Sequence, residues 1–183
     1  DFKGLCLGVD ASNLLFNSAR AFPGPDQYHS QPPIAQTSLV TGFKSFVTKC
    51  KAAGISKVVF VFDGKYTPPK QSTHHQRQAA KNKAVEAVVT AMKATTKDKK
   101  LNGLKKKASY PREDGIFLVI EYLNTQGDFV EIICAPYEAD HMLAYLDHNG
   151  KTDVTYSQDG DLFILGCKKL MSYPSLGTKN IPL

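Results

Sequence analysis

Short apolar runs alternate with amphipathic stretches along this chain. Four short runs are rich in β-branched and aromatic residues and are bounded by polar or acidic positions, which is typical of buried strands. These runs are Leu5–Val9, Val58–Phe62, Phe129–Cys134 and Val154–Ser157. Apolar residues recur at helical spacing in five other stretches: Ala11–Arg20, Ser38–Ala53, His75–Ala94, Asp114–Gln126 and Glu138–His148. Strands that alternate with helices predict an α/β fold, with a central, mostly parallel sheet flanked by helices.

Two segments show neither pattern. Pro23–Pro33 is rich in proline, glycine and polar residues, and Thr95–Arg112 contains Gly103, a run of lysines and Pro111. Glycine and proline interrupt regular structure, and connecting segments run over protein surfaces. We therefore expect both segments to be irregular and exposed.

The length and composition bound the class of protein. A chain of 183 residues, 42% of them hydrophobic, can bury one sizeable core and predicts a single domain over residues 1–183. Its four cysteines show no close pairing, which predicts a reducing, intracellular compartment. No stretch approaches the roughly 20 apolar residues that span a bilayer. We expect a soluble monomer that does not act at a membrane.

The positive charge of the chain is concentrated in one segment. Between Lys65 and Lys107 there are twelve Lys or Arg residues and two acidic ones, so this segment carries +10. Because the whole chain carries +6, the remainder carries −4. A basic arm on a mildly acidic body indicates a polyanionic partner. A solvated lysine-rich helix and loop would give the same charge run, so the arm alone does not decide between the two.

Acidic residues follow each of the four predicted strands. They are Asp10, Asp63, Glu138, Asp140, Asp159 and Asp161. In an open parallel α/β sheet, ligands bind at the carboxyl ends of the strands. A single Asp at such a position is more often a helix cap or a turn former. Because four separate segments each place acids at this edge of the sheet, one shared site is favoured over a series of separate caps and turns.

A cluster of carboxylates needs positive charge. Like charges at close range raise the pKa of the acids and destabilise the fold unless cations offset them. Oxygen ligands select hard cations, so Mg²⁺ is the expected ion and Mn²⁺ an expected substitute. Two such ions, typically about 4 Å apart, can activate a water and stabilise a leaving oxygen. The predicted reaction is the hydrolysis of phosphodiester bonds.

Four motifs, in order along the chain, resemble those of the flap endonuclease superfamily of XPG-type 5′ nucleases. They are Gly8–Ser12, Val61–Lys65, Ala135–Asp140 and Ser157–Leu162. With Leu143–Leu146 and Gly166–Lys169, the chain looks most similar to the exonuclease-one branch, which acts in mismatch repair and end resection. The resemblance covers nearly the whole chain.

The resemblance implies a PIN-like fold with two catalytic metal ions. It also implies cleavage of DNA near junctions of single and double strands, at 5′ flaps or recessed ends, in repair or replication. In a eukaryote the compartment would be the nucleus. Relatives carry a further Asp and a helix–turn–helix element downstream, both absent from the 183 residues. We expect the parent protein to be longer, and any sliding clamp or repair factor to bind through that downstream sequence.

The resemblance also assigns DNA contacts. In relatives a Lys and an Arg, on the helix after the second acidic motif, contact the scissile phosphate; Lys70 and Arg77 stand seven and fourteen residues after Asp63. An aromatic residue near the first motif stacks on a nucleobase, and Phe16 has that position, although it could equally be a core residue. The basic segment, about residues 65–112, corresponds to a helical arch beside the single strand. The predicted DNA-binding residues are Lys65, Lys70, Arg77, Lys81 and Phe16.

Roles within the acidic cluster are a hypothesis. One metal ion would be held by Asp63, Glu138, Asp140 and Asp159. The second would lie toward Asp159 and Asp161, and Asp10 would act through metal-bound water.

Three other functions fit parts of the pattern. A degenerate relative could bind nucleic acid or proteins as an inert scaffold, but inert relatives usually lose several acids, and all six are present. A PIN-type ribonuclease stays open, because the sequence does not show whether a 2′-hydroxyl is tolerated. A haloacid-type phosphatase needs a second Asp two residues after the first, and position 12 is Ser. That function is excluded.

Overall fold

A computed structural model describes residues 2–21, 37–65, 71–94 and 98–171, with the side chains of residues 71–75, 78 and 98–100 left out. The chain forms two compact units. The first, the sheet unit, comprises residues 1–14, 43–65 and 120–183. The second, the helical unit, comprises residues 15–42 and 66–119. Whether residues 1–183 act as a single catalytic core stays a prediction.

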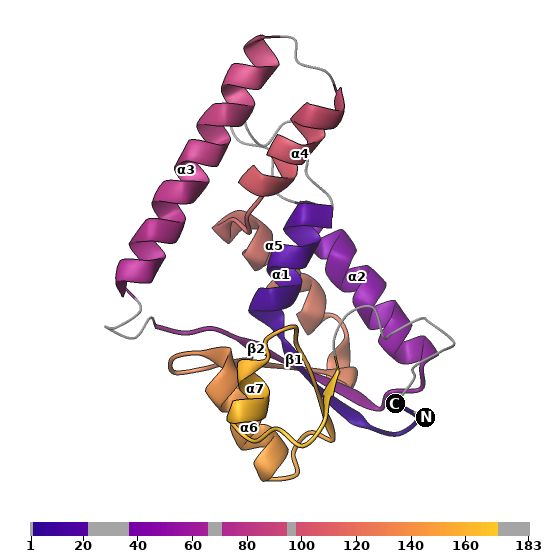
Figure 1. Ribbon diagram of the computed structural model, residues 1–183. Coiled ribbons are helices and arrows are strands. Elements are labelled where there is room, and N and C mark those ends of the chain that lie inside the picture. The colour runs from indigo at the N-terminus through magenta and orange to yellow at the C-terminus, as the bar shows by residue number, and fades with distance from the viewer. Residues whose placement is uncertain (1, 22–36, 66–70, 95–97, 172–183) are drawn as a thin grey trace. The chain divides into compact units, whose positions relative to one another are not determined.

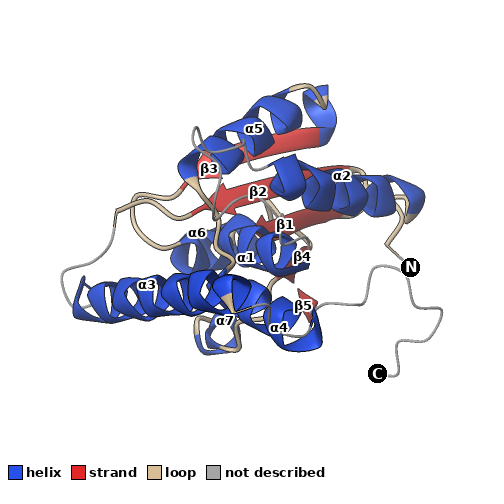
Figure 2. Ribbon diagram, turned by 90° about the horizontal axis from the view of Figure 1, so that it is seen from above, coloured by secondary structure: helices blue, strands red, loops and turns tan. Residues whose placement is uncertain are grey.

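The sheet unit is built on five strands in the order β3-β2-β1-β4-β5. Their bounds are β1 Cys6–Asp10, β2 Lys57–Phe62, β3 Val130–Cys134, β4 Val154–Tyr156 and β5 Leu170–Met171. All four strand pairs within the described residues are parallel, and the strands are the red arrows of Figure 2. The predicted α/β fold is therefore confirmed. Strand β5 was not predicted, because two residues are too short for a hydrophobic period to show.

Helices cover both faces of this sheet. Helix α2 (Thr37–Ala52) packs Phe43 and Phe46 against Phe60 of β2, with ring centroids 5.5 and 6.0 Å apart. Helix α6 (Ala139–His148) packs Leu143 against the neighbouring β2 residue Val59, in one buried cluster. Successive strand residues point to opposite faces. A strand covered on both faces must be apolar throughout, which explains the unbroken apolar run of β2.

Four further helical segments lie within the described residues, apart from α3 (Gln71–Lys93) and α4 (Asp98–Ala108). They are α1 Ala11–Ala21, α5 Glu113–Asn124, the 3-10 turn η2 Gly127–Phe129, and α7 Asp161–Ile164. Helices α1, α2 and α5 each begin in one unit and end in the other. The four-residue α7 was not predicted, because one turn is too short to show a helical period.

The helical unit contains a hairpin of α3 (Gln71–Lys93) and α4 (Asp98–Ala108). The two helices lie side by side, as Figure 1 shows. The prediction of an irregular segment over Thr95–Arg112 was wrong for α4. Leu101, Leu104 and Ala108 are spaced to share one helix face, and Ala108 is fully buried. This apolar stripe outweighs Gly103 and the lysines. The other predicted loop, Pro23–Pro33, lies outside the described residues.

Within the described ranges, no helix combines the length and the apolar character needed to cross a bilayer.

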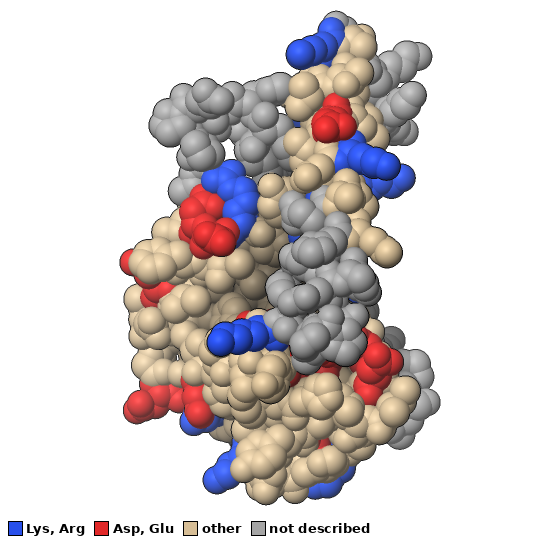
Figure 3. Space-filling view, turned by 90° about the vertical axis from the view of Figure 1, so that its left-hand side faces the viewer, with Lys and Arg blue, Asp and Glu red and all other residues tan. Residues whose placement is uncertain are grey.

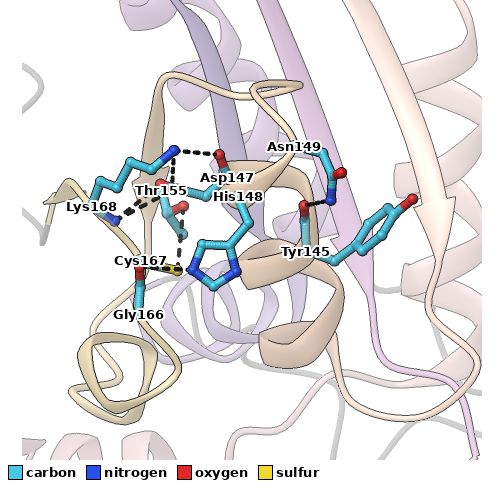
Figure 4. A network of polar contacts seen from close by, with 8 residues as sticks. All are labelled: Tyr145, Asp147, His148, Asn149, Thr155, Gly166, Cys167 and Lys168. Atoms are coloured by element: carbon cyan, nitrogen blue, oxygen red, sulfur yellow. Dashed lines mark hydrogen bonds and ion pairs between the residues drawn. The ribbon is translucent and has the colours of Figure 1, made fainter.

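A polar network ties the end of α6 to the segment between α7 and β5 (Figure 4). The buried carboxylate of Asp147 accepts hydrogen bonds from the backbone N–H of Lys168, 3.3 Å from each oxygen. Nε2 of His148 lies 3.1 Å from the carbonyl oxygen of Gly166. Gly166 has a φ of +86°, and a Cβ there would lie 2.9 Å from His148 Nε2. The network therefore fixes the chain that leaves α7.

Candidate active site

The carboxyl ends of the strands gather the predicted acids within the sheet unit. Asp10 is the last residue of β1, and Asp63 directly follows the adjacent β2. Asp159 and Asp161 follow β4, which pairs with β1 on its other side. Glu138 and Asp140 begin α6, which packs against β1, β2 and β4. All six acids therefore lie at one edge of the sheet.

Asp10 is buried and both of its carboxylate oxygens accept hydrogen bonds. Oδ1 accepts the backbone N–H of Asn13 at 2.9 Å, which caps the first turn of α1. Oδ2 accepts the hydroxyl of Ser157, also at 2.9 Å. Burial raises the pKa of Asp10, while these two hydrogen bonds oppose the shift and the charges of Asp63 and Asp159 add to it. The orientation of this carboxylate is fixed by its partners.

Asp63 is joined to the start of α6. Its Oδ1 accepts the backbone N–H of Ala139 at 2.8 Å. Gly64, the next residue, donates its N–H to the carbonyl of Tyr137. A Cβ at Gly64 would lie 1.9 Å from the carbonyl oxygen of Ala135, so only glycine fits here. The close approach brings the loop before Glu138 against Asp63.

The pKa of Asp140 is raised both by its burial and by the other acids of the cluster. Burial is the largest influence, and the charges of Asp10, Asp159, Asp63 and Glu138 also act in the same direction. Together they raise the pKa of Asp140 to about 7. Four acids from other parts of the cluster thus lie close enough to change its ionisation. The sequence prediction that these segments converge agrees with this electrostatic coupling.

Asp159 and Asp161 lie in a turn that is ordered by hydrogen bonds. The N–H of Asp159 donates to Oγ of Ser157 at 3.1 Å, and the N–H of Asp161 donates to Oδ1 of Asp159 at 3.0 Å. Both acids are exposed. One oxygen of Asp159 is therefore engaged within the turn, while both side chains remain accessible to a ligand.

Ser157 is the site residue that sequence reasoning missed. It is fully buried and contacts two members of the acidic cluster. The register pairs Val9 with Tyr156, so the next residues along, Asp10 and Ser157, are neighbours. This adjacency follows from the strand pairing, and the sequence does not give the pairing. The only signal was the position of Ser157 at the start of the last acidic motif.

The acidic side chains offer the oxygen donors that a hard divalent cation prefers, but they do not form a ready-made set of ligands around one ion. Carboxylate oxygens are the donors that Mg²⁺ prefers, and burial together with the charges of four neighbouring acids raises the pKa of Asp140, so a cation would favour its ionised form. Among the described residues, however, no three Asp, Glu, His or Cys side chains are grouped so that they could hold one ion. Ion binding would have to draw these side chains together.

The predicted DNA contacts of the helical unit surround Lys81. Its Nζ lies 5.4 Å from the ring centroid of Phe16 and 5.2 Å from that of Tyr110. Burial lowers the pKa of Lys81, and the positive charge of Arg77 lowers it further. Phe16 is 38% exposed, so it is not a core residue. Its exposed ring remains available for stacking.

The other predicted DNA contacts are only partly described. Arg77 is exposed on α3, and Lys65 is exposed in the sheet unit, whereas Lys70 lies outside the described residues. In the view of Figure 3, Lys and Arg side chains (blue) lie at separate places along the surface formed by α3, with an acidic group (red) between them. The DNA-binding roles of these residues stay predictions.

Two family models match the sequence. The model of the XPG N-terminal domain matches residues 1–84, and that of the XPG I-region matches residues 129–181. The first range contains Asp10 and Asp63, and the second contains the other four acids. The whole acidic cluster therefore lies within segments that resemble this family.

Relatives with similar sequences include flap endonucleases and exonucleases. "Flap endonuclease 1" of Picrophilus torridus is 26% identical over 174 residues, which is 93% of this chain and 50% of that protein. "Exonuclease 1" of Xenopus laevis is 30% identical over 119 residues, which is 63% of this chain and 15% of that protein. The chain spans about half the length of the flap endonucleases it matches.

Solved structures share the fold. The catalytic core of Rad2 in complex with a DNA substrate has a TM-score of 0.64 and 25% identity, and the match covers 95% of this chain and 45% of that one. Flap endonuclease-1 from Methanococcus jannaschii has a TM-score of 0.59 and 21% identity, covering 100% of this chain and 56% of that one. These matches confirm the predicted PIN-like α/β fold.

Proposed function

Since the chain belongs to the XPG-type 5′ nuclease superfamily, we propose that it is a 5′ nuclease that hydrolyses phosphodiester bonds of DNA. Its substrates are duplexes with junctions of single and double strands, such as 5′ flaps or recessed 5′ ends. The observation that carries the proposal is the convergence of acids from four segments at one sheet edge, where burial and the charges of the neighbouring acids raise the pKa of Asp140 to about 7.

The proposed cofactor is a pair of Mg²⁺ ions, for which Mn²⁺ would substitute. Asp63, Glu138, Asp140, Asp159 and Asp161 would hold them, with Asp10 acting through bound water. When bound, such ions supply a water nucleophile at neutral pH and stabilise charge on the leaving oxygen. The donor type, and the charges of the four acids that act on Asp140 in addition to its burial, support this proposal.

The chain's own residues prepare the site for this chemistry. The hydrogen bonds from Asn13 and Ser157 hold the Asp10 carboxylate in one orientation. The bond from Ala139 holds Asp63 at the start of α6. A carboxylate that is already oriented loses little further freedom when it takes up a ligand. Asp159 and Asp161, which are exposed, present the side of the cluster that substrate phosphates can reach.

Basic residues would bind the polyanionic substrate. Lys65, Lys70, Arg77 and Lys81 are the proposed phosphate contacts, and Phe16 is the proposed stacking platform. The charge of +10 between residues 65 and 107 supports this assignment. In a longer parent protein, downstream sequence would add a duplex grip and contacts to a clamp or to repair factors.

The proposed compartment is intracellular and reducing, and in a eukaryote it is the nucleus. All four cysteines lie within the described residues and are free, which supports a reducing environment.

Cleavage of labelled DNA tests the proposal. The chain is incubated with a 5′-flap substrate and a recessed-end duplex, in Mg²⁺ or in EDTA, beside the double variant Asp159→Ala/Asp161→Ala. We expect Mg²⁺-dependent cutting that is abolished in the double variant, because carboxylates that would hold the ions are lost, with DNA affinity nearly unchanged.

An RNA version of each substrate separates the remaining alternatives. Preferential cutting of RNA would favour a PIN-type ribonuclease. Salt-sensitive binding of DNA without cutting would favour the inert scaffold, provided that a chain extended by its natural downstream sequence also failed to cut. Equal cutting by the double variant would contradict the assigned site.

A further inference from the structure

We propose that Ser157 is a positioning residue that keeps the Asp10 carboxylate beside the Asp159–Asp161 turn and so favours the binding of metal ions by these acids. This inference rests on the proposed function, since it concerns the same site. Ser157 itself would contact neither metal nor DNA, because it is fully buried.

The Ser157 hydroxyl joins two arms of the cluster. It donates to Oδ2 of Asp10 at 2.9 Å and accepts the N–H of Asp159 at 3.1 Å. The turn continues this chain of bonds, because Oδ1 of Asp159 accepts the N–H of Asp161. Three hydrogen bonds thus connect Asp10, at the end of β1, to Asp161, at the start of α7.

The backbone of Ser157 is itself fixed. Its N–H donates to the carbonyl of Met171 in β5 at 3.2 Å, and the β1–β4 register places it beside Asp10. The hydroxyl is therefore presented from a sheet that is paired on both sides. A hydroxyl on a backbone that is held in this way can keep its hydrogen-bond partners in place, whereas a hydroxyl on a mobile loop cannot.

Only a hydroxyl can serve both partners at this position. A serine hydroxyl donates one hydrogen bond and accepts others, whereas alanine would leave Oδ2 of Asp10 and the N–H of Asp159 without their partner. Asp10 would keep one hydrogen bond, from Asn13, and could rotate about it. Metal binding would then have to order the acids as well, and this would lower the affinity for the metal.

The test measures Mn²⁺ binding by titration calorimetry, with DNA cleavage and thermal unfolding measured on the same samples. Ser157→Ala is compared with the unaltered chain and with Ser157→Thr, which keeps the hydroxyl. We expect Mn²⁺ affinity to fall by about 10- to 100-fold in Ser157→Ala, the range typical of residues that orient metal ligands. In Ser157→Thr most of the affinity should remain, and DNA affinity without metal should not change in either variant.

Thr152→Val is the matched control. The Thr152 hydroxyl is also buried in the sheet unit, yet it has no hydrogen-bond partner among the residues that the structure describes. Its replacement by the isosteric valine removes a buried hydroxyl without touching the acids. Mn²⁺ affinity should be the same as in the unaltered chain. If Ser157→Ala does not fold, Ser157→Cys serves in its place, since a thiol fills the space but is a weak donor.

A double-mutant cycle with Asp10→Ala tests whether Ser157 affects Mn²⁺ affinity through Asp10. If Ser157 acts by positioning Asp10, much of its effect on Mn²⁺ affinity should disappear when Asp10 is absent. Full additivity, or unchanged Mn²⁺ affinity in Ser157→Ala, would overturn the inference while leaving the proposed nuclease intact. Failure of the unaltered chain to bind Mn²⁺ would overturn the proposed function, and the inference with it.

Discussion

The carboxyl group of Asp140 illustrates, at the scale of one residue, how the fold changes side-chain chemistry. An aspartate in an unfolded chain has a pKa of about 3.8, whereas in the folded protein the pKa of Asp140 is about 7. The folded state therefore binds the proton more tightly than the unfolded state does. Between these two values, stability falls as pH rises, because ionisation is easier in the unfolded chain.

This shift predicts a pH-dependent effect of Asp140→Asn. The amide resembles the protonated acid, so the metal-free variant should match the unaltered chain near pH 4 and become the more stable of the two as pH rises toward 7. Thermal unfolding across this pH range measures the difference. Mg²⁺ should stabilise the unaltered chain above pH 7 and have little effect on the variant. A difference that does not vary with pH would contradict the assigned cause.

Gly64 is a second residue whose role depends on its surroundings. Gly64→Ala would place a Cβ 1.9 Å from the carbonyl oxygen of Ala135, forcing the backbone beside Asp63 to move. We expect a loss of about 1–3 kcal/mol in the free energy of unfolding, as for other overpacked sites, and a loss of cleavage. Urea denaturation measures the first and the flap assay measures the second.

Gly103→Ala is the matched control for Gly64→Ala. Gly103 lies in α4 with nothing within 4 Å of its added Cβ. In a helix interior alanine is more favourable than glycine by roughly 0.5–1 kcal/mol, so this variant should be slightly more stable. Equal destabilisation by both substitutions would show that the close approach at Gly64 is not the cause.

At the scale of the element, the length of each strand or helix largely determined whether it could be predicted from the sequence. The strands β1 to β4 and the helices α1, α2, α3, α5 and α6 each contain enough residues to show a period, and all were predicted. β5 and α7 contain two and four residues and were missed. α4 was missed for another reason: packing against α3 stabilises an apolar stripe that its lysines and Gly103 obscure.

The basic face of α4 predicts a change in the salt dependence of DNA binding. Lys106 and Lys107 are exposed, and each phosphate contact to a single strand contributes about 0.7 to the slope of log K against log salt. Lys106→Gln/Lys107→Gln should reduce that slope by up to about 1.4, with little change in the cleavage rate at saturating DNA. Fluorescence anisotropy at several salt concentrations measures the slope.

Lys151→Gln controls for loss of charge alone. Lys151 is exposed and precedes β4, so it lies at the sheet edge opposite the acids. Its replacement should leave the salt slope unchanged. An equal reduction in both variants would mean that net charge, and not the α4 face, governs binding.

At the scale of the whole molecule, the sequence predicted which acids lie at one edge of the sheet but not how they are held. Acids that follow the strands of a parallel sheet must reach the same edge, so their membership could be inferred. Their hydrogen bonds to Asn13, Ala139 and Ser157 depend on backbone positions that only the folded chain defines. For the same reason, the pKa of Asp140 could be expected to rise but not to reach a given value.

The pairing of β1 with β4 has a consequence for the order in which the molecule forms. Asp10 ends β1 and Asp159 follows β4, and these two strands meet only when residues about 150 positions apart are brought together. Contacts between residues so distant in the chain close a long loop and are costly to form early. Before β4 docks, Asp159 and Asp161 therefore lie apart from Asp10. The docking of β4 adds the charge of Asp159 to those of the other acids, so the event that joins β4 to the sheet also increases the demand for a cation.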